Sequence, residues 1–234
     1  MNQAADSMVE QAEDESPRTL IGATYTKLRH DIVGGRLQPG QKLRVDHLKS
    51  SYQVSSGTMR EALALLVSDA LVVAQGQRGF RVTSVSLADL EDLTRVRVLL
   101  ETEAVRDSIL LGKDDWEANL VGAFHRLTRA EERLRTDPGG SFDEWEQCNR
   151  RFHEALTAAC RSRWVQRMRL MLYQQSERYR RIAATQGPPP IEVHSEHTGI
   201  FEAALARNAE TACALLTIHI HRALLVIRTA GLLP

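Results

Sequence analysis

The chain has 234 residues, of which 43% are hydrophobic, and its 30 basic residues balance 30 acidic ones. This length allows one large or two small domains with a real core, and no apolar run reaches the ~18 residues of a membrane helix. Residues 1–16 lack the apolar segment of a signal peptide, and three cysteines without a Cys-x-x-Cys pair exclude a disulfide framework. We therefore expect a cytoplasmic protein with no membrane partner.

The neutral total charge hides an uneven distribution. Residues 1–16 contain five acidic and no basic residues, which predicts a disordered acidic tail over 1–17. Residues 17–83 contain ten basic and only four acidic residues. A small basic segment beside a neutral remainder indicates a module that binds a polyanion.

The first predicted element after the tail is a helix over 20–34. Its apolar side consists of Leu20, Ala23, Thr24, Leu28 and Ile32. The pair Pro39-Gly40 predicts a turn, a short helix follows over 45–52, and another over 56–70.

The stretch 54–63 carries the start of that last helix. Ser55 or Ser56 can cap it, because a serine oxygen accepts hydrogen bonds from the free amides of the first turn. Behind the cap, Leu63, Leu66, Val67 and Leu71 line one face. The first turn then presents small polar groups and Arg60, which suits entry into a DNA major groove. An ordinary surface helix is the alternative for this stretch taken alone.

Two β-type runs complete the first domain, at 71–74 and 79–82. The polar, glycine-containing residues between them predict a hairpin with Arg78 at its tip. The order of helix, helix, tight turn, helix and hairpin predicts a winged helix-turn-helix domain over 18–84.

Everything after residue 86 is predicted to be helical. The predicted spans form an antiparallel bundle over 86–234, so the fold class is mostly α. These spans are 87–111, 114–135, 142–160, 164–185, 191–207 and 209–230.

Three histidines and one amide on these helices can meet in the bundle core. Asn149 and His153 are four residues apart on one helix face, and His197 and His219 lie on apolar faces of two later helices. Three imidazoles suit a divalent ion such as Zn²⁺ or Ni²⁺.

Other interpretations of these histidines stay open. Histidines on apolar faces are often hydrogen-bonded core residues. His194 and His221 lie close to His197 and His219 in the sequence, and a different helix register would turn them inward instead. A metal-dependent hydrolase with a basic accessory domain is the alternative function, although no His-Glu-x-x-His pattern supplies a general base.

Several motifs of the chain resemble those of a known protein family. Residues 37–43, 54–63 and 77–82 are similar to the winged helix-turn-helix of GntR transcription regulators. The helical part resembles the FadR-type effector domain, called FCD, through residues 97–101 and the motifs around His153, His197 and His219. The six predicted helices favour its shorter, VanR-like form.

The resemblance implies a ligand-responsive DNA-binding regulator and not an enzyme. It implies a homodimer on a palindromic, double-stranded operator, typically a repressor relieved by a small carboxylate. The residues that it assigns to DNA contact are Arg44, Ser55, Ser56, Thr58, Arg60, Arg78 and Gly79.

The resemblance also assigns the bundle residues. The metal ligands are Asn149, His153, His197 and His219, with Asn149 in place of the usual aspartate. Arg97 is the expected partner of the effector carboxylate, because a guanidinium can fork onto it. An ion pair between Arg97 and Glu101 is the alternative, and an effector domain without metal, whose histidines only hydrogen-bond the ligand, is a further one.

Overall fold

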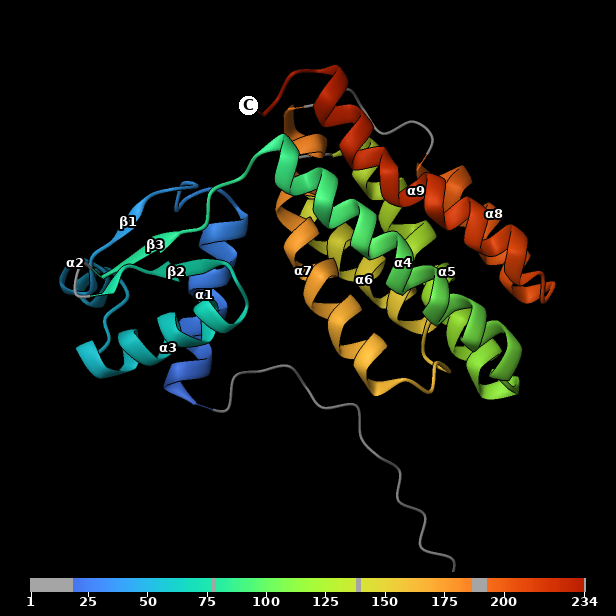
Figure 1. Ribbon diagram of the computed structural model, residues 1–234, viewed down its shortest axis with the longest axis horizontal. Helices are drawn as coiled ribbons and strands as arrows, with labels where there is room; N and C mark the ends of the chain where they lie inside the picture. The colour runs from blue at the N-terminus through green and yellow to red at the C-terminus, as the bar shows by residue number, and fades with distance from the viewer. Residues whose placement is uncertain (1–18, 77–78, 138–139, 187–192, 234) are drawn as a thin grey trace, which may run out of the picture.

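The computed structural model describes residues 19–76, 79–137, 140–186 and 193–233, so the predicted tail over 1–17 lies outside the described residues. The chain forms a small N-terminal unit and a larger helical bundle, joined by the segment before α4 (Figure 1).

The N-terminal unit consists of three helices and a small sheet. The elements in chain order are α1 (Leu20–Val33), β1 (Lys42–Leu43), α2 (Val45–Ser51), α3 (Ser56–Ser68), β2 (Val72–Ala74) and β3 (Phe80–Val82). Their core is a cluster of buried side chains that includes Leu28, Met59, Leu63, Leu66 and Val82. The helix-helix-helix-hairpin order that the sequence predicts is therefore confirmed.

The sheet and the ends of the helices differ from the predictions in three details. The sheet has a third strand, β1, which pairs with β3 in the order β1-β3-β2. Two residues between a turn and a helix carry no periodic pattern, so the sequence did not reveal this strand. Helix α3 ends at Ser68, earlier than predicted, because Ala70 takes a left-handed φ of 57°. On α1, Leu20 and Ala23 are exposed and not on the buried side, which consists of Thr24, Leu28 and Ile32 with Asp31 and Val33.

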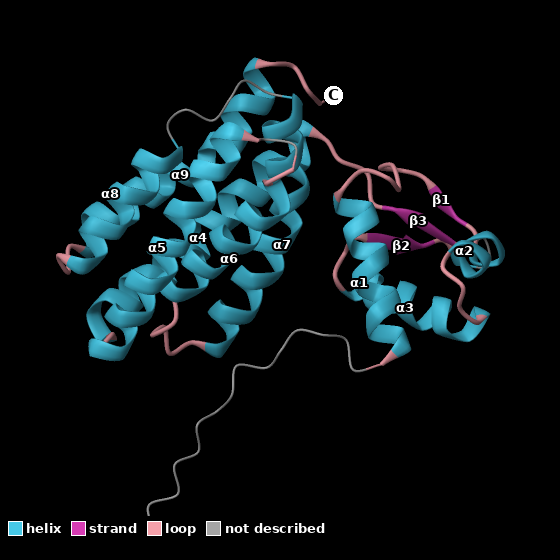
Figure 2. Ribbon diagram, turned by 180° about the vertical axis from the view of Figure 1, so that it is seen from behind, coloured by secondary structure: helices cyan, strands magenta, loops and turns pink. Residues whose placement is uncertain are grey.

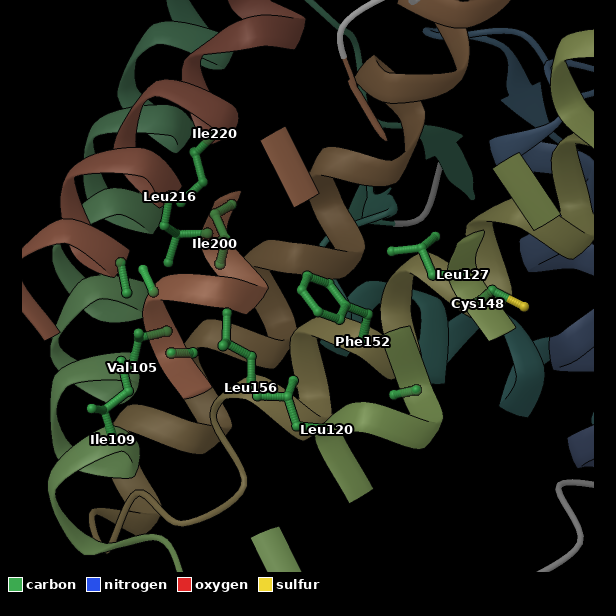
Figure 3. Packing of buried hydrophobic residues seen from close by; sticks show 14 of the residues in the cluster. Val105, Ile109, Leu120, Leu127, Cys148, Phe152, Leu156, Ile200, Leu216 and Ile220 are labelled. Atoms are coloured by element: carbon green, nitrogen blue, oxygen red, sulfur yellow. The ribbon is translucent and has the colours of Figure 1, made fainter. Parts of the chain in front are cut away.

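The bundle contains the six predicted helices. They are α4 (Leu87–Leu111), α5 (Asp114–Thr136), α6 (Phe142–Leu156), α7 (Arg163–Gln186), α8 (Val193–Leu205) and α9 (Ala209–Thr229). Helix α4 packs along α9 and α7, while α5 packs along α6 and α8 along α9. Figure 3 shows Phe152 and Leu156 of α6 among aliphatic side chains of α4, α5, α8 and α9.

Helix α6 is shorter than the predicted span of 142–160. It ends at Leu156, and the backbone then turns. The Thr157 hydroxyl donates to the His153 carbonyl at 2.9 Å, and the Gln166 side chain donates to the Thr157 carbonyl. Two backbone carbonyls at the end of the helix thereby have hydrogen-bond donors.

Helix α9 is long and apolar enough to cross a membrane by length and composition alone. Its apolar side is explained by packing, since Leu216, Ile220 and Ile227 are buried against the rest of the bundle. The same helix carries His219 and Arg222, so the finding is weak evidence for a membrane span.

Helix α7 connects the two units. Its Glu177 pairs with Arg29 of α1, and its Arg178 donates to the Thr83 carbonyl at 2.7 Å. The Gln175 side chain donates to the Asp69 carbonyl after α3. Figure 2 shows α7 on the side of the bundle that faces α1.

Candidate functional site

The start of α3 is built as a capped, polar helix terminus. Ser55 is the N-cap, and its Oγ accepts from the Thr58 amide at 3.0 Å and contacts the Thr58 hydroxyl at 3.0 Å. Ser56 is the first helical residue, and the side chain of Arg60 is exposed on the next turn. Arg60 forms no ion pair within the part of the chain that the structure describes. Its charge is therefore available to an anionic partner.

Two further predicted contact residues lie on the same unit. Arg44 is exposed at the N-terminus of α2, where its side chain makes no capping hydrogen bond. Gly79 follows the hairpin turn with a φ of 91°, a left-handed conformation that favours glycine. Arg78 lies outside the described residues. The start of α3, the end of β2 and the start of β3 lie on the side away from the bundle (Figure 1).

The bundle brings together the three predicted histidines. His153 of α6, His197 of α8 and His219 of α9 each offer one ring nitrogen, and these nitrogens lie within 4.8 Å of one another. The imidazoles of His197 and His219 are closest, with ring centroids 4.5 Å apart. The competing histidines do not join the cluster. His194 is half-exposed, and His221 donates through Nδ1 to the Thr217 carbonyl of its own helix at 2.8 Å.

Each imidazole faces a carboxylate through its Nδ1 atom. Glu131 lies 2.6 Å from His197 Nδ1 and Glu196 lies 3.0 Å from His219 Nδ1. Glu101 approaches His153 Nδ1 less closely, at 3.5 Å. A carboxylate at Nδ1 fixes the ring and leaves Nε2 as the ligand atom, as metal-binding histidines require.

The protonation states suit metal binding. Burial lowers the pKa of His153 to about 3. Burial, helped by the neighbouring His197, lowers the pKa of His219 to about 4. Both imidazoles are therefore neutral at pH 7, which is the form that coordinates a metal ion.

The three carboxylates are ionised. Burial alone would raise the pKa of Glu196, but its hydrogen bonds with His219 and Arg222 bring it to about 2. Burial opposes ionisation of Glu131 as well, yet the hydrogen bonds with His197 and His194 hold its pKa below the usual value. For Glu101, the charge of Arg97 outweighs burial and holds the pKa well below its usual range.

Four buried polar atoms at this place lack a hydrogen-bond partner among the described residues. Two of them, Nδ1 of His153 and Oε2 of Glu101, face each other at 3.5 Å, and the other two are Nε2 of His197 and Oδ1 of Asn149. The Asn149 amide is oriented by Tyr173, because its Nδ2 donates to the Tyr173 hydroxyl at 2.8 Å and thereby leaves Oδ1 unpaired. Buried acceptors are rarely left unsatisfied, so a divalent cation fits this donor set of three imidazoles and one amide oxygen.

A cavity of about 150 Å³ opens beside these donors. Its polar lining residues are Asn149, His153, Tyr173 and His219 together with Arg97, Arg180 and Arg222, and His197 is fully buried. Much of the remaining wall is apolar, with Leu134, Trp145, Val193, Ile220, Ala223 and Val226. A small, largely apolar ligand with one polar end suits this cavity.

Arg97 forms the ion pair with Glu101 that the sequence offered as the alternative, and its role toward an effector stays a prediction. Its Nε and Nη2 atoms donate to one oxygen of Glu101 at 2.8 and 2.5 Å, so the ion pair is present. The same side chain also lines the cavity. Arg97 therefore contacts both the cavity and the carboxylate that faces His153.

The sequence interpretation missed four residues of this site. Glu101 belonged to a quoted motif and Glu196 directly precedes His197, so both had a local signal. Glu131 lies 66 residues before His197, and Tyr173 lies 24 residues after Asn149. Only the packing of α5 and α7 onto the histidine helices brings these last two into place.

Models of two protein families match the chain. The model described as bacterial regulatory proteins of the gntR family matches residues 20–82, and the FCD domain model matches residues 92–222. The first match covers α1 to β3, and the second covers the helices that carry the histidine cluster.

Characterised and uncharacterised relatives agree with these matches. The HTH-type transcriptional regulator BphR of Paraburkholderia xenovorans is 51% identical, over 92% of this chain and 88% of that protein. The HTH-type transcriptional repressor GlaR of Escherichia coli is 33% identical, over 88% of this chain and 94% of the repressor.

Solved structures share the fold. Escherichia coli McbR/YncC superposes with a TM-score of 0.72 at 22% identity, covering 91% of this chain and 99% of that one. A GntR transcriptional regulator from Rhodococcus sp. RHA1 superposes with a TM-score of 0.70, also at 22% identity, covering 90% of this chain and 98% of the other.

Proposed function

Because the chain belongs to the GntR family of bacterial regulatory proteins and carries an FCD domain, we propose that it binds a palindromic operator as a homodimer. It is a DNA-binding transcriptional regulator with an effector-binding domain, not an enzyme. We propose further that it represses transcription in the cytoplasm until a small carboxylate binds in the bundle. Its relative GlaR is named a transcriptional repressor, which supports that direction.

The observation that carries the DNA-binding role is the exposed start of α3. A helix N-terminus with free amides, two serines and the unpaired Arg60 can approach phosphates and base edges. In this proposal Arg60 contacts a guanine edge or a phosphate, while Ser55, Ser56 and Thr58 contact the sugar-phosphate backbone. Arg44 adds a phosphate contact from α2. Arg78 and Gly79 bring the wing to the minor groove.

The bundle supplies the regulatory site in the same proposal. Asn149, His153, His197 and His219 would hold a divalent ion, with Zn²⁺ or Ni²⁺ suiting the imidazole donors best. When bound, such an ion offers a positive charge at the polar end of the cavity. Arg97 lines the same cavity and would orient the carboxylate of the effector.

Effector binding changes DNA affinity only if the effector prefers one arrangement of the protein. Helix α7 provides a physical connection, because Tyr173 and Arg180 line the cavity while Gln175 and Glu177 contact the N-terminal unit. The alternative of a metal-dependent hydrolase has no support, since the relatives are named as transcriptional regulators.

Operator binding by an Arg60 variant tests the proposal. In a gel-shift assay with DNA from the upstream region of its own gene, Arg60→Ala is expected to abolish the specific complex, while the protein stays folded. Arg129→Ala is the matched control, because Arg129 is exposed on α5 and pairs only with Glu132 at 2.9 Å. An unchanged shift for Arg60→Ala would show that Arg60 does not contact DNA. If the wild-type protein shifts no segment of the upstream region, the proposed operator binding is contradicted.

A further inference from the structure

The end of α3 and the end of the hairpin are tied together in the N-terminal unit. Thr83, which follows β3, donates through its amide to the Leu71 carbonyl at 3.0 Å and through its hydroxyl to the Ala70 carbonyl at 2.8 Å. Asp69 is the C-cap of α3 directly before these two residues. We call Asp69, Ala70, Leu71 and Thr83 the junction. A contact that fixes the junction therefore fixes α3 and the hairpin together.

Two side chains of α7 donate to this junction. Gln175 donates through Nε2 to the Asp69 carbonyl, and the Arg178 guanidinium donates to the Thr83 carbonyl at 2.7 Å. Residues three apart lie on one face of a helix, so both donors approach from the same side. The Tyr25 hydroxyl of α1 donates to the Asp69 carboxylate at 2.5 Å. The junction is therefore held by both α1 and α7.

Arg178 is buried without a close carboxylate. It is 5% exposed and forms no ion pair within the described residues, although Asp89 acts on it electrostatically. Burying a charge in this way is costly, and an apolar side chain would pack at lower cost. The hydrogen bond to the Thr83 carbonyl involves a charged donor, which makes it stronger than a neutral one. This contact therefore holds the junction in one place and does more than fill space.

Helix α3 turns a small movement of the junction into a larger movement of its start. The helix has 13 residues and runs from the side away from the bundle toward α7 (Figure 1). It is about 18 Å long at a rise of about 1.5 Å per residue. A tilt of about 10° at the junction therefore moves the start of α3 by about 3 Å, which is close to the rise of one base pair.

A dimer gains affinity from a second half-site only when its geometry allows both half-sites to bind at once. One inserted base pair changes their separation by about 3.4 Å and their relative rotation by about 35°. Resting on the homodimer and the palindromic operator of the proposed function, we propose that Gln175 and Arg178 are positioning residues that make the dimer select one half-site spacing. They act through the junction and do not contact DNA.

Four variants of α7 isolate these two hydrogen bonds. Gln175→Glu nearly keeps the shape of the side chain, but an ionised carboxylate cannot donate to a carbonyl. Gln174→Glu is the matched control, because Gln174 is the half-buried neighbour and forms no hydrogen bond within the described residues. Arg178→Met removes the donor and keeps an apolar stem, whereas Arg178→Lys keeps a cation that can donate to the Thr83 carbonyl.

The experiment compares DNA duplexes that differ only in the spacing of the half-sites. Footprinting of the wild-type protein on the upstream region of its own gene first locates the half-sites. Fluorescence anisotropy then gives the affinity of the full-length protein for three kinds of duplex. These have the natural spacing, a spacing changed by one or two base pairs in either direction, or a single half-site.

The wild-type protein is expected to lose about tenfold or more in affinity when the spacing changes by two base pairs. Gln175→Glu and Arg178→Met should lose less than about threefold, because a loosely held N-terminal unit can follow its half-site. Both variants should bind the single half-site as tightly as wild type does, which a folding defect would not permit. Gln174→Glu and Arg178→Lys should keep the wild-type dependence on spacing.

The inference is overturned if Gln175→Glu and Arg178→Met both keep the wild-type dependence on spacing, or if both lose affinity for the single half-site in parallel. A wild-type protein that binds every spacing equally well also overturns it. Failure of the proposed function looks different. If footprinting finds no pair of symmetric half-sites, the palindromic operator itself is wrong, and the inference falls with it.

Discussion

At the scale of single residues, the candidate metal centre depends on the carboxylates behind its histidines. Glu131 shows this most clearly, because it holds His197 with one oxygen and His194 with the other. A carboxylate in this position fixes the tautomer and orientation of the ring and makes it a better ligand. Without the carboxylate, the ring would lose the partner that sets which of its nitrogens carries the proton.

Removing the charge of Glu131 is therefore expected to weaken metal binding. Glu131→Gln should lower zinc affinity by about 10-fold to 100-fold, measured by competition with a chromophoric chelator. Glu132→Gln is the control, because Glu132 directly follows Glu131 in the chain, its carboxylate is half-exposed, and it pairs with Arg129 on the surface. Equal zinc affinities for wild type and Glu131→Gln would show that the carboxylate does not support the ligand.

Residue-level prediction from the sequence was effective where the signal was local. Asn149 and His153 share a helix face at a spacing of four, and the apolar neighbours of His197 and His219 indicated that they point inward. The structure brings the three histidines together. Glu131 could not be predicted, because its position depends on how α5 packs against α8, and pairing across helices leaves no periodic signal in one sequence.

At the scale of elements, α7 has contacts on both sides. Tyr173 and Arg180 line the cavity, whereas Glu177 and Arg178 contact the N-terminal unit. The residues on the two sides are only two to five positions apart on one helix and cannot move independently, so a ligand that displaces one side of α7 also displaces the other. The pair of Arg29 and Glu177 is only partly exposed, which makes it less screened than a surface ion pair.

Charge reversal at this contact tests whether α7 holds the two units together. Glu177→Arg places two like charges against each other and should increase the radius of gyration in small-angle X-ray scattering. The double variant Arg29→Glu with Glu177→Arg restores opposite charges and should return the radius toward that of wild type. A radius that is unchanged by Glu177→Arg would mean that this pair does not position the N-terminal unit.

The elements themselves were well predicted because their periodicity is strong. All six helices of the bundle lie where the apolar spacing placed them, with small differences at their ends. The exceptions have local causes that periodicity does not contain: the left-handed Ala70 ends α3, and the hydrogen bonds of Thr157 accompany the early end of α6. The strand β1 is only two residues long, too short for any alternation to appear.

At the scale of the whole molecule, charge and function are divided between the two units. The excess of basic residues lies in the segment 17–83, whereas the bundle contains the cavity beside the histidine cluster. A regulator needs this division, because one surface must attract a polyanion while the other site selects a small molecule.

DNA binding by the basic unit is the central claim, and its salt dependence tests it most directly. The measurement is the affinity of wild type for labelled DNA from its own upstream region, by fluorescence anisotropy over a series of salt concentrations. Each neutralised phosphate releases counterions, so the logarithm of the affinity should fall linearly with the logarithm of the salt concentration, with a slope of about −5 or steeper. Arg60→Ala should bind far more weakly at every concentration, and Arg129→Ala should follow wild type. Affinity that is absent at low salt, or that does not change with salt, would contradict the assignment of the α3 surface to DNA.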